Sequence, residues 1–219
     1  MKHLDVEPVL PAWLEPARAG LTRYAELLAG PGTERGLIGP REIPRLWDRH
    51  ILNCAVVAEP TLNLIPHAVM VADVGSGAGL PGLVWGLARP DITVVLVEPL
   101  LRRATFLTEA AVELGVADRV SVVRSRAEDL PGNPMWSGAD VVTARAVASM
   151  DKLVGWTLPL ARKGGTLVAL KGASAQEEVD AAAEVLKAAG VVEVSVLTVG
   201  AGVVDPLTTV VVARTSLAH

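Results

Sequence analysis

Short valine-rich runs alternate with helical patterns from Val69 to the end of the chain, and this alternation restricts the possible folds more than any other feature. Segments of this kind form parallel strands whose two faces are buried by the helices between them. Predicted strands cover residues 69–74, 93–97, 120–124, 140–143, 165–170, 191–198 and 208–213. The sequence therefore predicts an α/β fold built on a seven-stranded sheet.

The connections between the strands add detail to this fold. Apolar residues repeat at helical spacing after the second strand, at Leu100, Ala104, Leu107, Ala111 and Leu114. A second helix is expected from the capping box Ser174–Glu177 to Gly190. Only a short glycine loop joins the last two strands, so we expect an antiparallel hairpin there. A mostly parallel sheet with an antiparallel last strand is typical of the methyltransferase variant of the doubly wound, Rossmann-like fold.

The first 60 residues lack this alternation and instead read as helices at about 21–28 and 44–58. The second helix carries one apolar stripe, formed by Trp47, Ile51, Cys54 and Ala58. We expect a single domain over 1–219, in which a helical cap at 1–60 packs on an α/β core at 61–219.

Composition limits the classes of function. No apolar run reaches the roughly 18 residues of a membrane helix, and the first residues lack the features of a secretory signal, so we expect a cytoplasmic protein. Cys54 is the single cysteine, and no histidine cluster accompanies it, so no disulfide or metal site is expected. A net charge of -4 means that any RNA contact must be local. We expect a monomer.

A glycine-rich loop, Asp73-Val74-Gly75-Ser76-Gly77-Ala78-Gly79-Leu80-Pro81-Gly82, follows the first strand. Closely spaced glycines let backbone approach a ligand where side chains would clash. Three of these glycines also match the dinucleotide pattern Gly-x-Gly-x-x-Gly. In a dinucleotide site, however, Asp73 would stand beside a pyrophosphate. S-adenosylmethionine, which presents an ammonium and a sulfonium, is the better ligand.

Two further segments fit this cofactor. Glu98 ends the second strand 23 residues after Gly75, where a carboxylate accepts hydrogen bonds from ribose hydroxyls. The segment Ser125-Arg126-Ala127-Glu128-Asp129 follows the third strand. Backbone amides and a carboxylate in such a loop can read the edge of the adenine.

Taken together and in order, these motifs resemble the bacterial small-subunit ribosomal RNA guanine-N7 methyltransferases, also known as glucose-inhibited division protein B. The resemblance extends over about 20–213. The Leu-Pro-Gly end of the glycine loop is its most specific part, together with the Arg-His-Ile-Leu segment before it. The matching segments are Asp48–Asn53, Asp73–Gly82, Ser125–Glu128, Ala144–Ala146 and Leu170–Gly172.

The resemblance implies a class I methyltransferase fold and methyl transfer from S-adenosylmethionine to N7 of one guanine in the decoding-region loop of 16S ribosomal RNA. It places Gly75 and Leu80 at the methionine end of the cofactor, Ala127 and Glu128 at the adenine, and Arg145 at the far side of the pocket. The full predicted cofactor set is Asp73, Gly75, Gly77, Gly79, Leu80, Glu98, Ala127, Glu128 and Arg145. The chain departs from the family pattern at Asn53, where many relatives have aspartate, and in its last hairpin, which lacks basic residues.

Guanine N7 has a lone pair and no proton, so its methylation needs no general base, and catalysis can depend mainly on alignment. Arg145 and Lys171, each just after a strand, are the predicted substrate-positioning residues, because arginine and lysine read the O6/N7 edge of guanine. Arg45, Arg49, His50 and Arg126 are the predicted contacts to 16S RNA or the small ribosomal subunit.

Two other functions remain open from the sequence. The same cofactor fold also serves methyltransferases that act on small molecules or proteins, and the fold alone does not separate them from RNA enzymes. A protein that binds S-adenosylmethionine without chemistry is the alternative from a different class.

Overall fold

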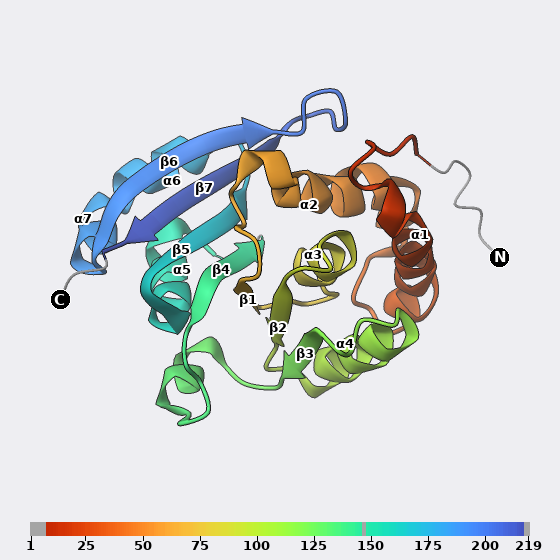
Figure 1. Cartoon of the computed structure of the whole chain (residues 1–219), viewed down its shortest axis with the longest axis horizontal. Coiled ribbons are helices and arrows are strands. Elements are labelled where there is room, and N and C mark those ends of the chain that lie inside the picture. Colours follow the sequence, from red (N-terminus) through yellow and green to blue (C-terminus); the bar gives the residue numbers. More distant parts are fainter. Residues whose placement is uncertain (1–7, 146–147, 217–219) are drawn as a thin grey trace.

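The computed structural model of the protein describes residues 8–145 and 148–216, and its centre is one seven-stranded sheet in the order β3-β2-β1-β4-β5-β7-β6 (Figure 1). β1 pairs in parallel with β2 and β4, and the parallel part continues to β3 and β5. β7 is antiparallel to both β5 and β6. The predicted seven strands and antiparallel ending are confirmed. The strands are β1 (Met70–Val74), β2 (Thr93–Val97), β3 (Val120–Val123), β4 (Ala139–Arg145), β5 (Ala161–Lys171), β6 (Val191–Val199) and β7 (Thr208–Thr215).

Helices cover both faces of the sheet because its strands are apolar on both sides. Val71 and Val141 point to one hydrophobic core, and their neighbours Ala72 and Val142 point to the other. Figure 1 shows α3 and α4 on one side of the sheet and the last three helices on the other. These helices are α3 (Gly82–Ala88), α4 (Leu101–Glu113), α5 (Met150–Thr157), α6 (Ala175–Ala181) and α7 (Ala183–Ala188), with short 3-10 turns η7 (Ala127–Gly132) and η8 (Leu158–Leu160) between them.

The N-terminal helices pack on the first of these two cores. The predicted stripe of Trp47, Ile51, Cys54 and Ala58 is buried there, together with side chains of α3 and α4. The N-terminal elements are η1 (Glu15–Ala17), α1 (Arg18–Leu27), η2 (Leu28–Gly32), η3 (Pro40–Arg45), η4 (Leu46–Leu52), α2 (Asn53–Ala55), η5 (Val56–Ala58) and η6 (Pro60–Leu62). Of these, η2 and η4 are π-helical. We call residues 8–58 the cap.

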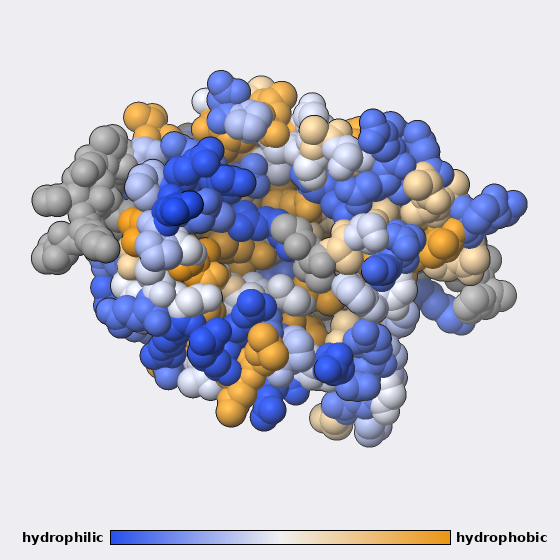
Figure 2. Space-filling model, turned by 180° about the vertical axis from the view of Figure 1, so that it is seen from behind, coloured by the Kyte–Doolittle hydropathy of each residue, from blue (hydrophilic) through white to orange (hydrophobic). Residues whose placement is uncertain are grey.

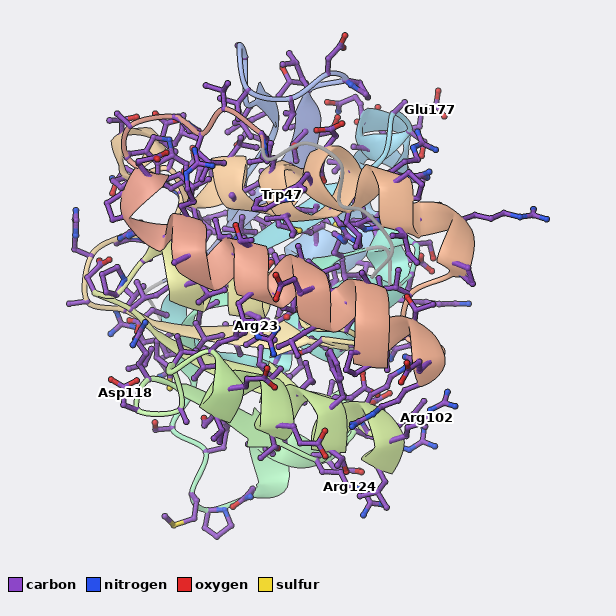
Figure 3. All side chains as sticks on the ribbon, turned by 90° about the vertical axis from the view of Figure 1, so that its right-hand side faces the viewer. Arg23, Trp47, Arg102, Asp118, Arg124 and Glu177 are labelled. Atoms are coloured by element: carbon purple, nitrogen blue, oxygen red, sulfur yellow. The ribbon has the colours of Figure 1, made fainter. Side chains whose placement is uncertain are left out.

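Polar contacts join the cap to the core as well. The Tyr24 hydroxyl donates to the Ala78 carbonyl at 2.8 Å, and Trp85 Nε1 donates to the Cys54 carbonyl at 2.8 Å. Figure 3 shows α1 lying between η4–α2 and α4, with Arg23 at the boundary where it pairs with Glu113 of α4. The cap is therefore fixed directly over α3 and α4.

The structure corrects the predicted helix over 174–190. It is two helices, α6 and α7, separated at Ala182, whose backbone (φ -94°, ψ 6°) leaves the helical region. The capping box does not form, because Ser174 (φ -79°, ψ 8°) lacks the extended backbone that aims an N-cap side chain at the first turn. Its hydroxyl donates to Glu178 instead. Within the part of the chain that the structure covers, no helix is long and apolar enough to cross a membrane.

Candidate active site

The glycine loop leaves the carboxyl end of β1 and leads into α3. Gly75, Gly77 and Gly79 have φ angles of 68°, 60° and 103°, a region that side chains other than glycine rarely adopt. A β-carbon on Gly79 would lie 2.5 Å from Leu83 Cδ1 and 3.0 Å from the Tyr24 hydroxyl. The turn therefore requires glycine both for its backbone and for the space beneath it.

Asp73 lies beneath this loop and is fully buried. Its Oδ2 accepts a hydrogen bond from the Gly82 amide at 3.0 Å, whereas Oδ1 has no partner in the described part of the chain. Burial raises the pKa of Asp73 to about 7. Asp73 therefore ties the loop to the start of α3 from beneath, and its contact with the cofactor stays a prediction.

The other predicted cofactor residues follow β2 and β3, beside the glycine loop. Glu98 directly follows β2 and is buried, with Oε2 accepting from the Gly77 amide at 2.9 Å and Oε1 from the Leu100 amide at 3.0 Å. Ala127 and Glu128 open η7 after β3, the first buried and the second exposed. Because parallel strands end at the same edge, the structure brings these residues to one side of the sheet.

A cleft of about 1240 Å³ opens next to this edge, between the cap and the ends of β4 and β5. The face seen in Figure 2 is hollowed near its centre, with hydrophilic residues around the hollow. We call this space the Arg145 cleft. It is lined by Arg145 and Lys171, by Glu42, Arg45, Arg49, His50 and Asn53 of the cap, and by Asp205–Thr209, which span the loop before β7 and the first two residues of that strand.

Arg145 ends β4 and is held entirely by the cap. Its Nη2 lies 2.7 Å from His50 Nδ1, and its Nη1 donates to the Arg49 carbonyl at 3.4 Å and to Cys54 Sγ at 3.5 Å. None of these acceptors is a carboxylate. The guanidinium therefore keeps its positive charge at the wall of the cleft.

His50 lies between Arg145 and Glu42. Its side chain is only 11% exposed, and its second ring nitrogen, Nε2, lies 2.8 Å from Glu42 Oε2. Burial lowers the pKa of His50. Both ring nitrogens are engaged, so a contact of His50 with a phosphate would require one of these two interactions to open, and the RNA contact stays a prediction.

Lys171 ends β5, and its side chain is only 7% exposed. Its Nζ donates to Glu178 Oε2 and to the Ala148 carbonyl, both at 2.6 Å. This ion pair lowers the pKa of Glu178. Lys171 thus contacts Ala148, three residues after the end of β4, and the predicted contact with a substrate would require the ion pair to open.

The predicted RNA-contacting arginines are exposed. Arg45 and Arg49 stand at the cap side of the Arg145 cleft, with Arg49 Nη1 3.7 Å from Glu42 Oε1. Arg126 follows β3 and directly precedes η7. Arg102 and Arg124 project at one end of the molecule in Figure 3. Exposed arginines therefore lie both at the cap side of the Arg145 cleft and in the segments that follow β2 and β3.

Sequence reasoning missed two contacts that shape the cleft. Glu42 has no motif around it, and only the folded cap brings it to His50. Asn53, a departure from the family pattern, donates through Nδ2 to the Thr208 hydroxyl at 2.7 Å and so joins the cap to β7. Ala146, the last residue of a matching segment, lies outside the described residues. Among those described, no cluster of three or more histidine, cysteine or acidic residues suited to a metal ion occurs.

Comparison with known proteins adds to this geometry. A family model described as rRNA small subunit methyltransferase G matches residues 18–206. The chain is 53% identical over 215 residues to a protein of Mycolicibacterium gilvum named ribosomal RNA small subunit methyltransferase G, covering 97% of this chain and 92% of that protein. A protein of the same name from Streptomyces avermitilis is 56% identical over 193 residues, covering 88% and 78%.

The architecture also matches solved structures at low sequence identity. An O-methyltransferase from Bacillus cereus, solved in complex with S-adenosylhomocysteine, superposes with a TM-score of 0.63 at 14% identity and covers 90% of this chain and 91% of that one. This similarity establishes the Rossmann-like methyltransferase fold.

Proposed function

Because the chain belongs to the rRNA small subunit methyltransferase G family, we propose that it transfers a methyl group from S-adenosylmethionine to N7 of one guanine in 16S ribosomal RNA. The observation that carries the proposal is the Arg145 guanidinium, which has no carboxylate partner among the described residues and stands between the glycine loop's edge of the sheet and a wide cleft. The enzyme is expected to act in the cytoplasm as a monomer, on 16S RNA or the small ribosomal subunit.

The residues at the cofactor edge fit S-adenosylmethionine. When bound, this cofactor supplies a methyl group on a positively charged sulfur. Gly75, Gly77 and Gly79 let backbone approach the ligand, and the buried carboxylates of Asp73 and Glu98 favour a cation over the phosphates of a dinucleotide. Ala127 and Glu128 are placed to read the adenine, with Leu80 at the methionine end.

The chain contributes alignment to the reaction. Guanine N7 carries a lone pair and no proton, so no residue needs to remove one. Holding a nucleophile and its target at contact distance can supply about 7–11 kcal/mol of the barrier. Arg145 is suited to hold the base, since an arginine donates to the O6 of guanine while the N7 edge faces the reacting carbon.

The exposed arginines support RNA as the substrate in preference to a small molecule or a protein. Arg45 and Arg49 stand at the rim of the Arg145 cleft, where they can contact phosphates. The cleft, at about 1240 Å³, is also larger than the roughly 300–1,000 Å³ typical of small-molecule pockets. A non-catalytic sensor of S-adenosylmethionine would need no such opening beside its cofactor.

The test is methyl transfer from tritiated S-adenosylmethionine to 16S RNA and to small subunits from cells that lack the protein. Label should appear on one of the two, and mass spectrometry of the product should find N7-methylguanine. Absence of label from both substrates would contradict the proposal, and label at another atom would contradict the assigned position.

Arg145→Ala should abolish transfer without unfolding the protein. Lys163→Ala is the matched control, because Lys163 is exposed near the start of β5, at the opposite edge of the sheet from Lys171. The control should methylate like the wild type. Full activity of the Arg145 variant would remove this residue from the site.

A further inference from the structure

We propose that Glu42 is a positioning residue, which acts through His50 to set the orientation of Arg145 for methyl transfer. This inference rests on the proposed function. It starts from a chain of two short contacts, Glu42 Oε2 to His50 Nε2 at 2.8 Å and His50 Nδ1 to Arg145 Nη2 at 2.7 Å.

The position of the His50 ring proton follows from its two partners, the Arg145 guanidinium and the Glu42 carboxylate. An arginine can only donate hydrogen bonds, so His50 Nδ1 must accept from Arg145. The proton of the neutral ring then resides on Nε2 and is donated to the Glu42 carboxylate. Glu42 thereby selects the tautomer in which Nδ1 presents a lone pair to Arg145.

Glu42 is itself held from its other side. Arg49 Nη1 lies 3.7 Å from Glu42 Oε1, so this carboxylate faces a cation on one oxygen and the imidazole on the other. The His50 side chain is 11% exposed and that of Glu42 is 31% exposed. In this contact, the His50 imidazole is therefore shielded from water much more than the Glu42 carboxylate is.

His50 provides the only short contact that Arg145 makes in the described part of the chain. The distances from Nη1 to the Arg49 carbonyl and to Cys54 Sγ, 3.4 and 3.5 Å, are long. Within the same part of the chain, Nε–H and the second hydrogen on Nη2 donate to no protein group. Fixing Nη2 on His50 thus leaves donors of a planar, rigid group free for a base in the cleft.

The two residues that support Arg145, Glu42 and His50, come from neighbouring elements of the cap. Glu42 lies in η3, and His50 lies in η4, whose wider π-helical turns follow directly. Segments of π-helix are frequent at functional sites. Loss of Glu42 should leave the cap in place, because its side chain is not part of the hydrophobic core.

The experiment compares Glu42→Ala with Glu42→Gln, with Glu34→Ala as the matched control on an exposed cap residue. Glu42→Ala should lower kcat for methyl transfer about 10- to 100-fold, the range typical for loss of such supporting contacts. Its affinity for S-adenosylhomocysteine, measured by calorimetry, should stay at the wild-type value. The Gln variant should recover most of kcat, because its amide oxygen accepts from Nε2–H. The Glu34 variant should match the wild type.

A second readout does not depend on activity. Nitrogen NMR of labelled protein, with the His50 signals assigned by comparison with His50→Gln, should show the Nε2–H tautomer in the wild type and in Glu42→Gln. Glu42→Ala should show a mixture of tautomers.

Two results would overturn the inference: wild-type kcat in Glu42→Ala, or a ring proton on Nδ1 in the wild-type protein. If the wild type methylates neither 16S RNA nor small subunits, the proposed function fails instead, while the NMR measurement still decides whether Glu42 sets the tautomer.

Discussion

At the scale of single residues, Asp73 combines complete burial with a carboxylate oxygen that has no partner among the described residues. Its pKa is raised from 3.8 to about 7, chiefly by burial. The folded protein therefore binds this proton more tightly than the unfolded chain does. The free energy of unfolding should decrease as the pH rises from about 4 to 7, because the folded state must then hold an unpaired charge.

Asp73→Asn should remove this dependence and keep the acceptor for the Gly82 amide. Urea denaturation at pH 5 and pH 8 measures the effect. Relative to the variant, the wild type should lose on the order of 2 kcal/mol between the two pH values. All other titrating groups are common to both proteins and cancel. An equal stability difference at both pH values would show that Asp73 does not titrate in this range.

Single residues also show where sequence reasoning reaches its limit. Asp73, Glu98 and Arg145 could be selected because each lies at or just after the carboxyl end of a predicted strand, and parallel strands carry sites at that edge. Whether a selected side chain is free or engaged could not be predicted. His50 and Lys171 were chosen as contacts, but tertiary partners, Glu42 and Glu178, occupy them. These partners stand eight and seven residues away from them in the sequence, in separate elements of the fold.

At the scale of elements, the turn from β1 to α3 depends on Gly79. Alanine there would need φ near 103° and would press on Leu83 and Tyr24. We expect Gly79→Ala to destabilise the protein by about 1–3 kcal/mol and to weaken binding of S-adenosylhomocysteine at least about tenfold. Thermal unfolding and calorimetric titration measure the two effects.

Gly155→Ala in α5 is the matched control for this element. Apart from its chain neighbours and the nearby helix backbone, no atom of the described residues lies within 4 Å of the added β-carbon, and α5 is an ordinary helix. Alanine should there be neutral or stabilising by up to about 1 kcal/mol. Equal effects of the two substitutions would contradict the role assigned to the loop.

Helices and strands were predictable where a local pattern in the sequence specifies them. The strands were found because runs such as Thr93–Val97 are valine-rich, and α4 was found because its apolar positions repeat at helical spacing. The break at Ala182 was not predictable, because alanine favours helix and no glycine or proline stands at this position. α5 was missed as a separate helix. Its Met150, Leu153 and Val154 are buried and Ser149 stands at its N-cap, but the apolar run is short and no glycine marks its end.

At the scale of the whole molecule, the cap and one face of the sheet share a hydrophobic core. Trp47 in the cap and Trp85 in α3 both belong to it. We therefore propose that residues 8–216 unfold as one unit, as expected for a single domain. In urea, the transition followed by tryptophan fluorescence should coincide with the one followed by far-UV circular dichroism. Two separate midpoints would show that the cap unfolds independently.

Cys54 makes the packing of the cap on the core accessible to a chemical measurement. It is the chain's only cysteine, it is fully buried at the contact between the cap and Arg145, and burial raises its pKa to about 11. A thiol reagent can reach it only when the cap lifts away from the core. The rate of labelling in the native protein thus reports the rate at which the cap opens. A ligand that binds Arg145 should lower this rate.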